Sequence, residues 1–103
     1  MELKTTSKNG IEIRLTSERW KHIILMHPNL TNRQIEVLEA IKNPDCILKG
    51  NTEELLAVTK ISKRFYLVVV YRETGDDGFI ITAYETTETI WLFKKEMIWS
   101  KDS

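Results

Sequence analysis

Residues 64–86 read RFYLVVVYRETGDDGFIITAYET, two apolar runs on either side of the turn sequence TGDDG at residues 74–78. The first run, residues 64–71, is the most continuously apolar stretch of the chain, which is typical of a central strand covered on both faces. The second run, residues 79–86, predicts the strand that returns beside it, because glycine and aspartate favour a hairpin turn. An antiparallel hairpin is therefore the expected centre of the fold.

Two further apolar segments precede this hairpin. Residues 46–48 and 54–61 are rich in branched apolar side chains and lie on either side of the turn-forming pair Gly50-Asn51, so each predicts a strand. Ser62 and Lys63 predict a tight turn between residues 54–61 and the central strand. We therefore expect a meander of three or four antiparallel strands.

The N-terminal third predicts one strand and two helices. Residues 11–15 alternate apolar and charged side chains, as a half-buried strand does. Thr16 and Ser17 offer an N-cap to a helix that ends near His27, because Pro28 disfavours a helical conformation in the residue before it. Residues 31–34 match a capping box that opens a second helix, which ends at residues 43–45. The side chains expected to be buried are those of Trp20, Ile23, Ile24 and His27 in the first helix and Ile35, Leu38 and Ile41 in the second.

Residues 87–99 fit two structures. Ile90, Phe93, Met97 and Ile98 follow a helical spacing, whereas residues 90–93 alone also fit an edge strand. We favour the helix. The predicted fold is therefore a single α+β domain spanning residues 1–103, with an N-terminal short strand and two helices packed on a four-stranded antiparallel sheet, followed by a C-terminal helix.

Composition limits the classes of function. Fifteen Lys and Arg residues balance fifteen Asp and Glu residues, so the chain has no overall positive field and any nucleic-acid surface is expected to be a local patch. The single Cys46 cannot form an internal disulfide and fits a small buried apolar side chain better than a nucleophile. The N-terminal residues lack an apolar leader segment, and no apolar run approaches the roughly 20 residues of a membrane span. We expect a soluble, cytoplasmic protein without membrane contacts.

Both histidines of the chain, His22 and His27, fall in the first predicted helix, which also carries Arg19. Imidazole titrates unperturbed near neutral pH, so acid–base chemistry is expected here. The two rings point about 140° apart on a helix and cannot chelate one metal ion, and no carboxylate or cysteine cluster completes a site. We therefore expect neither a metal nor another cofactor. Arg19 and His22 are three residues apart and can face one cleft.

Two interpretations remain for His27 and for the polar side chains of the last long strand. His27 can bond a free carbonyl at the end of its helix, or it can act in catalysis. Thr82, Tyr84 and Thr86 project to one side of the strand, where they can bind phosphate oxygens or bases, but Thr and Tyr are also ordinary strand residues. The basic side chains best placed for a local patch are those of Lys63 and Arg64 at the predicted hairpin tip, together with Lys60, Lys94 and Lys95.

Five segments follow one another in an order that resembles a known nuclease group. They are LTSERWKHI at residues 15–23, HP at 27–28, IKNPD at 41–45, YLVVVY at 66–71 and ITAY at 81–84. The pattern spans most of the chain and is similar to phage and prokaryotic members of the barnase, EndoU, colicin and RelE (BECR) nuclease group. The layout also resembles that of BrnT-type toxins. The resemblance implies a helical pair on a four-stranded antiparallel sheet and a metal-independent ribonuclease, often the toxin of a toxin–antitoxin pair or a phage-related effector.

The resemblance also implies roles for individual residues. RNA cleavage by the 2′-hydroxyl needs a base, an acid and cations that stabilise the charge on phosphorus. His22 and His27 match the histidine positions of the group and would supply the base or acid. Arg19 matches its helix arginine, which contacts the phosphate, and Thr82 matches a strand hydroxyl that positions it. The expected substrate-binding residues are Lys63, Arg64, Tyr84 and Thr86.

RNA is the expected partner, together with an antitoxin protein. One property departs from the group: RelE-type ribonuclease toxins are usually strongly basic, whereas this chain is neutral, which weakens the case for tight, non-specific RNA binding. The alternative hypothesis is a non-catalytic interaction domain, in which residues 66–71, Trp91 and Trp99 bury surface against a partner or a second copy of the chain as a homodimer. A nuclease that acts on DNA is a third hypothesis.

Overall fold

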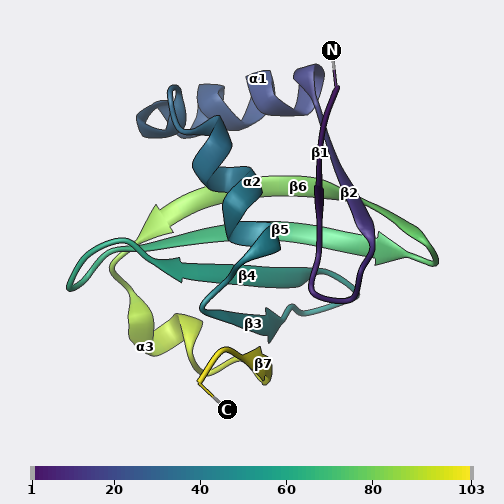
Figure 1. Cartoon of the computed structure of the whole chain (residues 1–103). Helices are drawn as coiled ribbons and strands as arrows, with labels where there is room; N and C mark the ends of the chain where they lie inside the picture. Colours follow the sequence, from purple (N-terminus) through teal and green to yellow (C-terminus); the bar gives the residue numbers. More distant parts are fainter. Residues whose placement is uncertain (1, 103) are drawn as a thin grey trace.

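The computed structural model describes residues 2–102. It contains one seven-stranded mixed sheet, in the order β1-β2-β6-β5-β4-β3-β7, with helices on both of its faces (Figure 1). The strands are β1 (Glu2–Thr6), β2 (Glu12–Thr16), β3 (Cys46–Lys49), β4 (Leu55–Lys60), β5 (Tyr66–Thr74), β6 (Asp77–Thr86) and β7 (Met97–Ser100). The helices are α1 (Ser17–Met26), the 3-10 helix η1 (Pro28–Leu30), α2 (Gln34–Lys42) and α3 (Thr89–Leu92). Within residues 2–102 no helix is long and apolar enough to cross a membrane.

The middle of the sheet is the antiparallel meander β3-β4-β5-β6. β5 lies between β4 and β6, with Val69 opposite Ala57 on one side and Ala83 on the other. Successive side chains of a strand point to opposite faces, and the side chains of Val68 and Val69 are both fully buried. The prediction of a central strand covered on both faces is therefore confirmed.

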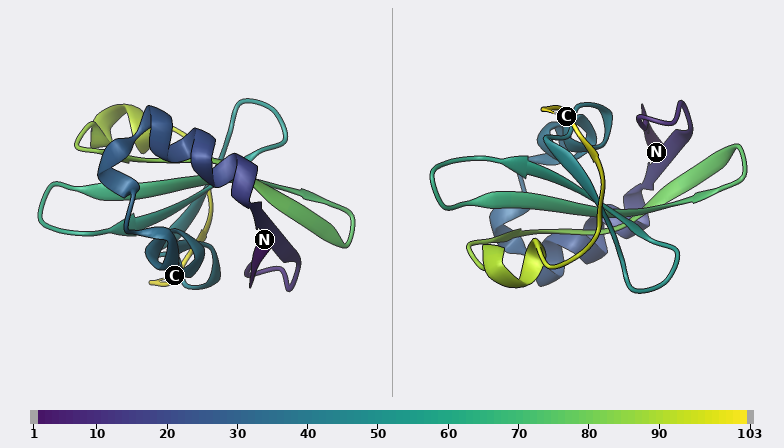
Figure 2. Two further views of the ribbon diagram at one scale, coloured as in Figure 1. Left: turned by 90° about the horizontal axis from the view of Figure 1, so that it is seen from above. Right: turned by 90° about the horizontal axis from the view of Figure 1, so that it is seen from below.

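The two faces of the sheet carry separate cores. α2 and the N-terminal hairpin lie on one face and α3 lies on the other, as both views of Figure 2 show. The larger core lies on the α2 face, where Ile41 of α2 packs with Val69 and Tyr71 of β5. The smaller core lies on the α3 face and joins Leu92 of α3 to Val68 of β5.

β2 enters the sheet through a parallel pairing with the first residues of β6. Three residue pairs make this contact, from Glu12 with Asp77 to Arg14 with Phe79, and the side chains of Arg14 and Asp77 form an ion pair. Beyond Phe79, no strand of residues 2–102 pairs with this edge of β6. α1 lies along that free stretch of edge, above β6 in Figure 1.

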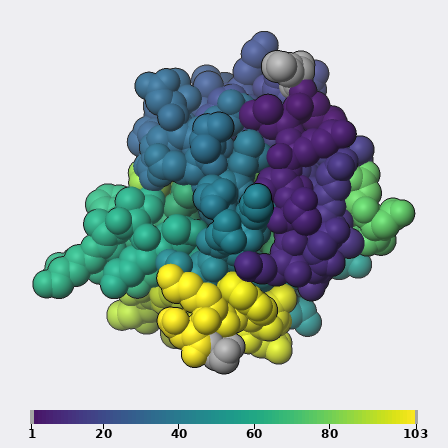
Figure 3. All heavy atoms as spheres, viewed as in Figure 1, coloured from purple at the N-terminus to yellow at the C-terminus, as the bar shows by residue number. Residues whose placement is uncertain are grey.

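The turn of the N-terminal hairpin lies close to the C-terminal strand on the α2 face. In Figure 3 the C-terminal residues lie below α2 and reach the N-terminal hairpin. The ammonium of Lys8 lies 5.1 Å from the centre of the Trp99 ring, and Lys101 forms an ion pair of 2.7 Å with Asp45. Burial alone would raise the pKa of Asp45, but hydrogen bonds from Lys101 and from the backbone N–H of Lys60 hold it below its ordinary value. These contacts fix β7 beside β3.

The predicted four-stranded antiparallel sheet is wrong, although the α+β class fits. β1 and β2 extend the meander beyond β6, and β7 extends it beyond β3, so the sheet is mixed and has seven strands. The predicted C-terminal helix is right only over Thr89–Leu92, the range of α3, because Met97–Ser100 instead form β7, which pairs with β3. The open edge of β3 offers backbone hydrogen-bonding groups to β7. The spacing of apolar residues carries no information about such a distant edge.

The helix starts are predicted correctly for α1 and incorrectly for α2. Thr16 caps α1, since its Oγ1 accepts a hydrogen bond of 3.1 Å from the N–H of Arg19. The capping box is wrong, because the Thr31 hydroxyl donates to the carbonyl of Pro28 and the N-cap residue of α2 makes no side-chain cap. The buried face of α2 also differs from the predicted one. Its buried side chains are Val37, Ala40 and Ile41, whereas Ile35 is 76 % exposed.

Gly78 permits the parallel pairing because the backbone is closely approached there. A Cβ at this position would lie 2.5 Å from the carbonyl oxygen of Arg72 and 2.6 Å from Cδ1 of Ile13. Contacts this short force backbone or side chain to move, which costs stability in a packed core.

We predict that Gly78→Ala destabilises the protein by about 1–3 kcal/mol, because the added Cβ would overlap the Arg72 carbonyl of β5 and the Ile13 side chain of β2. Urea unfolding measures the change. Asp76→Ala, in the exposed turn just before β6, is the control and should change the free energy of unfolding by less than about 0.5 kcal/mol. A Gly78→Ala protein as stable as the wild type would show that the pairing tolerates a wider spacing.

Tyr71 is fully buried in the larger core. Among residues 2–102 its hydroxyl has no hydrogen-bond partner. Burial, with the nearby Glu73 carboxylate as a smaller cause, raises the pKa of this phenol far above its ordinary value. A buried hydroxyl without a partner carries a desolvation cost that an apolar side chain lacks.

We predict that Tyr71→Phe leaves the free energy of unfolding unchanged or raises it by up to about 2 kcal/mol, because the substitution removes only the unpaired hydroxyl. Thermal and urea unfolding of the two proteins test this. Tyr71→Leu, which also changes the shape of the core, should lower stability. If Tyr71→Phe costs more than about 1 kcal/mol, the hydroxyl has a partner that stabilises it.

Candidate functional site

α1 follows the free edge of β6 and runs in the same direction as that strand (Figure 1). The C-terminal end of α1 is level with Tyr84, because the ring centres of His27 and Tyr84 lie 6.2 Å apart. Just beyond, the side-chain amide of Asn29 donates to the carboxylate of Glu85. These contacts fix the register of the helix along the strand.

The same register predicts that His22 lies at about the level of Thr82. Five helical residues separate His22 from His27, a distance of about 7.5 Å along the axis. Two strand residues separate Thr82 from Tyr84, a distance of about 6.6 Å. Because helix and strand run side by side in the same direction (Figure 1), we expect His22 at about the level of Thr82, although no residue of β6 lines the cavity that holds His22.

Arg19 and His22 occupy the flank of α1 that faces away from α2. Of the four side chains expected to be buried in α1, only Ile23 is fully buried, so it marks the side against the sheet edge. Trp20 lies on one flank of Ile23 and packs against the larger core on the α2 face. At 100° per residue, Arg19 and His22 fall on the other flank. That flank is open to solvent, since both side chains are exposed.

The side chains of Arg19 and His22 line one open surface cavity of about 380 Å³, together with Thr16 and Glu18. Within residues 2–102 neither side chain makes a hydrogen bond or an ion pair to another residue. A guanidinium and an imidazole without protein partners are available to a ligand. The structure thus brings together two of the four predicted catalytic residues.

His27 lies outside this cavity and is half-buried. Its backbone N–H donates to the carbonyl of Ile23 at 2.8 Å, and its own carbonyl accepts from the N–H of Leu30 at 3.0 Å. Within the described part of the chain its imidazole makes no hydrogen bond, so the ring does not bond a carbonyl at the end of the helix. The ring contacts Tyr84 instead.

Thr82, Tyr84 and Thr86 share the α3 face of the sheet. They lie opposite Val70, Val68 and Tyr66 of β5, and residues opposite each other across a strand pair share a face. Burial raises the pKa of the half-buried Tyr84, and the Thr86 hydroxyl accepts a hydrogen bond of 3.0 Å from the N–H of Glu88. These three side chains, here called the polar row of β6, therefore lie on one face of the sheet. The Thr86 hydroxyl already accepts one hydrogen bond from the chain itself.

Lys63 and Arg64 lie apart from the α1 cavity. Both are exposed in the loop between β4 and β5, beyond the pair formed by Tyr66 and Thr86. Thr86 is itself four strand residues, about 13 Å, past Thr82. These two cations can therefore contact only a ligand that extends along the sheet.

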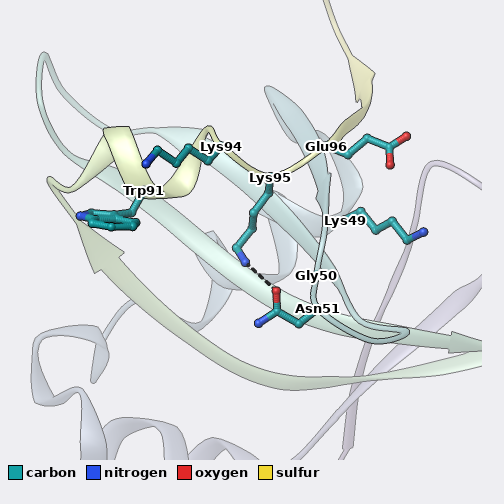
Figure 4. Close-up of a pocket in the computed structure, with 7 residues that line it drawn as sticks. All are labelled: Lys49, Gly50, Asn51, Trp91, Lys94, Lys95 and Glu96. Atoms are coloured by element: carbon teal, nitrogen blue, oxygen red, sulfur yellow. Dashed lines mark hydrogen bonds between the residues drawn. The ribbon is translucent and has the colours of Figure 1, made fainter.

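A second hollow on the α3 face was not predicted. Two adjoining cavities share Trp91 and Lys95, and one of them also contains Tyr84 and Thr86. The other includes Asn51, whose side-chain oxygen accepts a hydrogen bond of 3.4 Å from Lys95 (Figure 4). The sequence WLFKK at residues 91–95 places an aromatic residue close to two lysines. This was the one signal in the sequence from which the hollow could have been predicted.

The beginning of α2 is held to β6 by a polar cluster near His27. Glu85 accepts hydrogen bonds from Arg33 and Asn29, and Arg33 also pairs with Glu36 at 3.0 Å. Burial would raise the pKa of Glu85, but these two donors hold it below its ordinary value of 4.5. The cluster fixes the segment that follows α1, and so it fixes the end of α1 itself.

Comparison with known proteins gives no match: no family model, no curated protein and no solved structure is significantly similar to this chain. Cys46 is buried, as predicted, and burial followed by the charge of Asp45 raises the pKa of its thiol, which disfavours a nucleophilic role. In the part of the chain that the structure describes, no three His, Cys, Asp or Glu side chains are grouped so as to hold a metal ion. The candidate site is therefore defined by the geometry around α1 and β6.

We predict that Glu85→Gln lowers the free energy of unfolding by about 1–3 kcal/mol at pH 7, because a carboxylate that accepts two donors is replaced by a neutral amide. A carboxylate with a lowered folded-state pKa stabilises the protein above its unfolded value of 4.5, and that stabilisation is lost as the pH falls through the lower folded value. The difference between the two proteins should therefore shrink from pH 7 to pH 3 in urea unfolding.

Glu36→Gln is the matched control, because Glu36 pairs with the same arginine but its side chain is 55 % exposed. It should cost less than about 0.5 kcal/mol. An effect of Glu85→Gln that is the same at pH 3 and pH 7 would mean that charge is not the cause.

Proposed function

We propose that the protein is a ribonuclease that cleaves RNA without a metal ion, by attack of a 2′-hydroxyl on the neighbouring phosphate. The observation that carries the proposal is the open cavity in which the unpaired side chains of Arg19 and His22 lie next to each other. Both sit on the open flank of α1, which runs beside β6, the strand of Thr82 and Tyr84. A general acid or base, a fixed cation and a hydroxyl row are the groups that this reaction needs.

The proposed reaction uses these groups in defined steps. The 2′-oxygen forms a bond to phosphorus while the bond from phosphorus to the 5′-oxygen breaks, which leaves a 2′,3′-cyclic phosphate and a free 5′-hydroxyl. One group accepts the proton of the 2′-hydroxyl and an acid donates a proton to the departing 5′-oxygen. His22, in the cavity, takes one of these roles. His27, which lies outside the cavity beside Tyr84, is the candidate for the other where the RNA extends along β6. Arg19 stabilises the charge that builds on the phosphate oxygens, and the Thr82 hydroxyl positions them.

The cellular setting forms part of the same proposal and is supported only by the sequence resemblance. We propose that the protein acts in the cytoplasm as the toxin of a toxin–antitoxin pair or as a phage-related effector, with an antitoxin protein as its partner. The chain has a net charge of zero and therefore no long-range attraction for RNA. This fits a substrate that is bound by a few local contacts.

We predict that His22→Ala lowers the rate of RNA cleavage by about 10²–10⁴-fold, the usual contribution of a general acid or base. The assay follows end-labelled RNA in buffer that contains a chelator, and the expected product carries a 2′,3′-cyclic phosphate. The bell-shaped plot of rate against pH should lose one limb in the variant, as expected when a general acid or base is removed. DNA of the same sequence should not be cut, because it lacks the 2′-hydroxyl.

Lys21→Ala is the control, since Lys21 is an exposed cation on the same helix but points about 100° away from His22. It should retain nearly full activity. Cleavage that continues undiminished in His22→Ala removes this residue from the mechanism, and equal cleavage of DNA contradicts the 2′-hydroxyl reaction.

A second candidate function is self-association without catalysis. β7 pairs with β3 at one edge, and within residues 2–102 no strand pairs with its other edge. Its Met97 and Ile98 side chains are 49 % and 47 % exposed. An apolar strand at the end of a sheet can add a strand of a second copy. Size-exclusion chromatography of wild type and Ile98→Lys tests this, and a stable dimer that lacks nuclease activity would favour it.

A further inference from the structure

We propose that the hollow around Trp91 on the α3 face binds single-stranded RNA, with the indole stacking on an unpaired base and the neighbouring lysines contacting phosphate. The choice of RNA rests on the proposed function. The inference adds the form of the substrate and a binding site that lies away from the α1 cavity.

The indole of Trp91 lies at the surface and is not packed in a core. It is 69 % exposed, so the ring is accessible to a ligand. The ammonium of Lys94 lies 4.4 Å from the centre of the ring and holds it by a cation–π interaction (Figure 4). A fixed, exposed aromatic ring of this kind suits a base, because every base has a face that stacks.

Lys94 and Lys95 lie on the Trp91 side of the cavity, and Lys49 lines its far side and extends away from the ring (Figure 4). Within residues 2–102 none of Lys49, Lys94 and Lys95 forms an ion pair with a carboxylate. Lys95 donates to Asn51, and Lys94 rests on the indole. The carboxylate of Glu96 lines the same cavity, but in Figure 4 it extends away from Trp91 on the side of Lys49. Lysines that no carboxylate neutralises, beside an aromatic ring, are typical of a surface for single strands.

The floor of the hollow is held in shape by the loop between β3 and β4. The carboxylate of Glu54 accepts hydrogen bonds from the hydroxyl and the backbone N–H of Thr52, at 2.5 and 3.0 Å. These bonds lower the pKa of Glu54 to about 2. The N–H of Gly50 donates to the Glu54 carbonyl at 2.9 Å, and a Cβ on Gly50 would lie 2.5 Å from the Glu54 side chain. Asn51 is thus presented to Lys95 by an ordered loop.

The hollow is continuous with the proposed catalytic face. A cavity of about 420 Å³ on the side of Asn51 and one of about 290 Å³ on the side of Tyr84 share Trp91 and Lys95 as walls. Tyr84 in turn contacts the His27 ring. A strand with one base on Trp91 can therefore pass along Tyr84 to the side of β6 that carries Thr82. A duplex keeps its bases stacked inside and cannot place one on the indole.

The experiment measures binding separately from cleavage. Fluorescence anisotropy follows a labelled single-stranded oligonucleotide of 2′-O-methyl RNA, which has no free 2′-hydroxyl and is not cut. Trp91→Ala should weaken binding about tenfold or more, the usual effect of losing a base-stacking ring, while Trp91→Phe should keep most of the affinity. Ile90→Ala is the matched control, because Ile90 is 75 % exposed and lines neither cavity. Duplex RNA should bind at least tenfold more weakly than the single strand.

The lysines have a test of their own. Lys95→Gln should lower the dependence of log affinity on log salt by about 0.7, the value of one phosphate contact to a single strand. Lys42→Gln, an exposed lysine of α2 on the opposite face of the sheet, should leave that slope unchanged. Equal slopes for Lys95→Gln and wild type would contradict the phosphate contact.

The outcomes separate this inference from the proposed function. If His22→Ala abolishes cleavage but binds the oligonucleotide normally, and Trp91→Ala loses binding, both proposals are supported. If wild type cleaves RNA but Trp91→Ala binds as well as wild type, this inference is overturned and the ribonuclease proposal stands. If no RNA is cleaved but Trp91→Ala loses single-strand binding, this inference is supported and the ribonuclease proposal is overturned. If Trp91→Ala changes only self-association in sedimentation, the hollow is a protein interface and the inference is overturned.

Discussion

The short parallel pairing of β2 with β6 is the constraint on which the candidate site depends. It joins the N-terminal hairpin to the sheet at Asp77–Phe79 and is supported by the ion pair of Arg14 with Asp77. Gly78 allows the backbone to be approached at this point. Because the pairing ends after three residues, the rest of the β6 edge is free, and α1, which follows β2 directly, lies along it. A longer pairing would occupy the edge and displace α1, with Arg19 and His22, from β6.

The two faces of the sheet differ in how completely they are covered. α2 and the N-terminal hairpin cover one face and bury a large apolar core there. Within residues 2–102 the other face is covered less, by the four-residue helix α3, whose Leu92 packs on Val68. The polar row of β6 and the indole of Trp91 therefore reach solvent on that side. A face that is incompletely covered and bears polar and aromatic groups is the natural place for a ligand.

Charged side chains of this chain fall into two sets. Arg33, Asp45 and Glu85 are engaged in hydrogen bonds that hold α2, β3 and β6 together, and their pKa values are shifted accordingly. Arg19, His22 and Lys94 form no ion pair within residues 2–102 and lie at the α1 cavity or the Trp91 hollow. The net charge of zero does not show that some cations are paired and others are not. Interaction with an anionic ligand depends on where unpaired cations lie and not on their number.

The sequence by itself determined the features that depend on neighbours in the chain. The hairpin of β5 and β6, the Thr16 cap of α1 and the shared face of Arg19 and His22 follow from local turn, capping and helix geometry. The tertiary structure alone decided which edges pair, because strand pairing is made by backbone groups that carry no sequence signature. Pairing of β7 with β3 brings Asn51 to Lys95, 44 residues apart. The Trp91 hollow could therefore not be predicted from spacing, whereas the α1 cavity could.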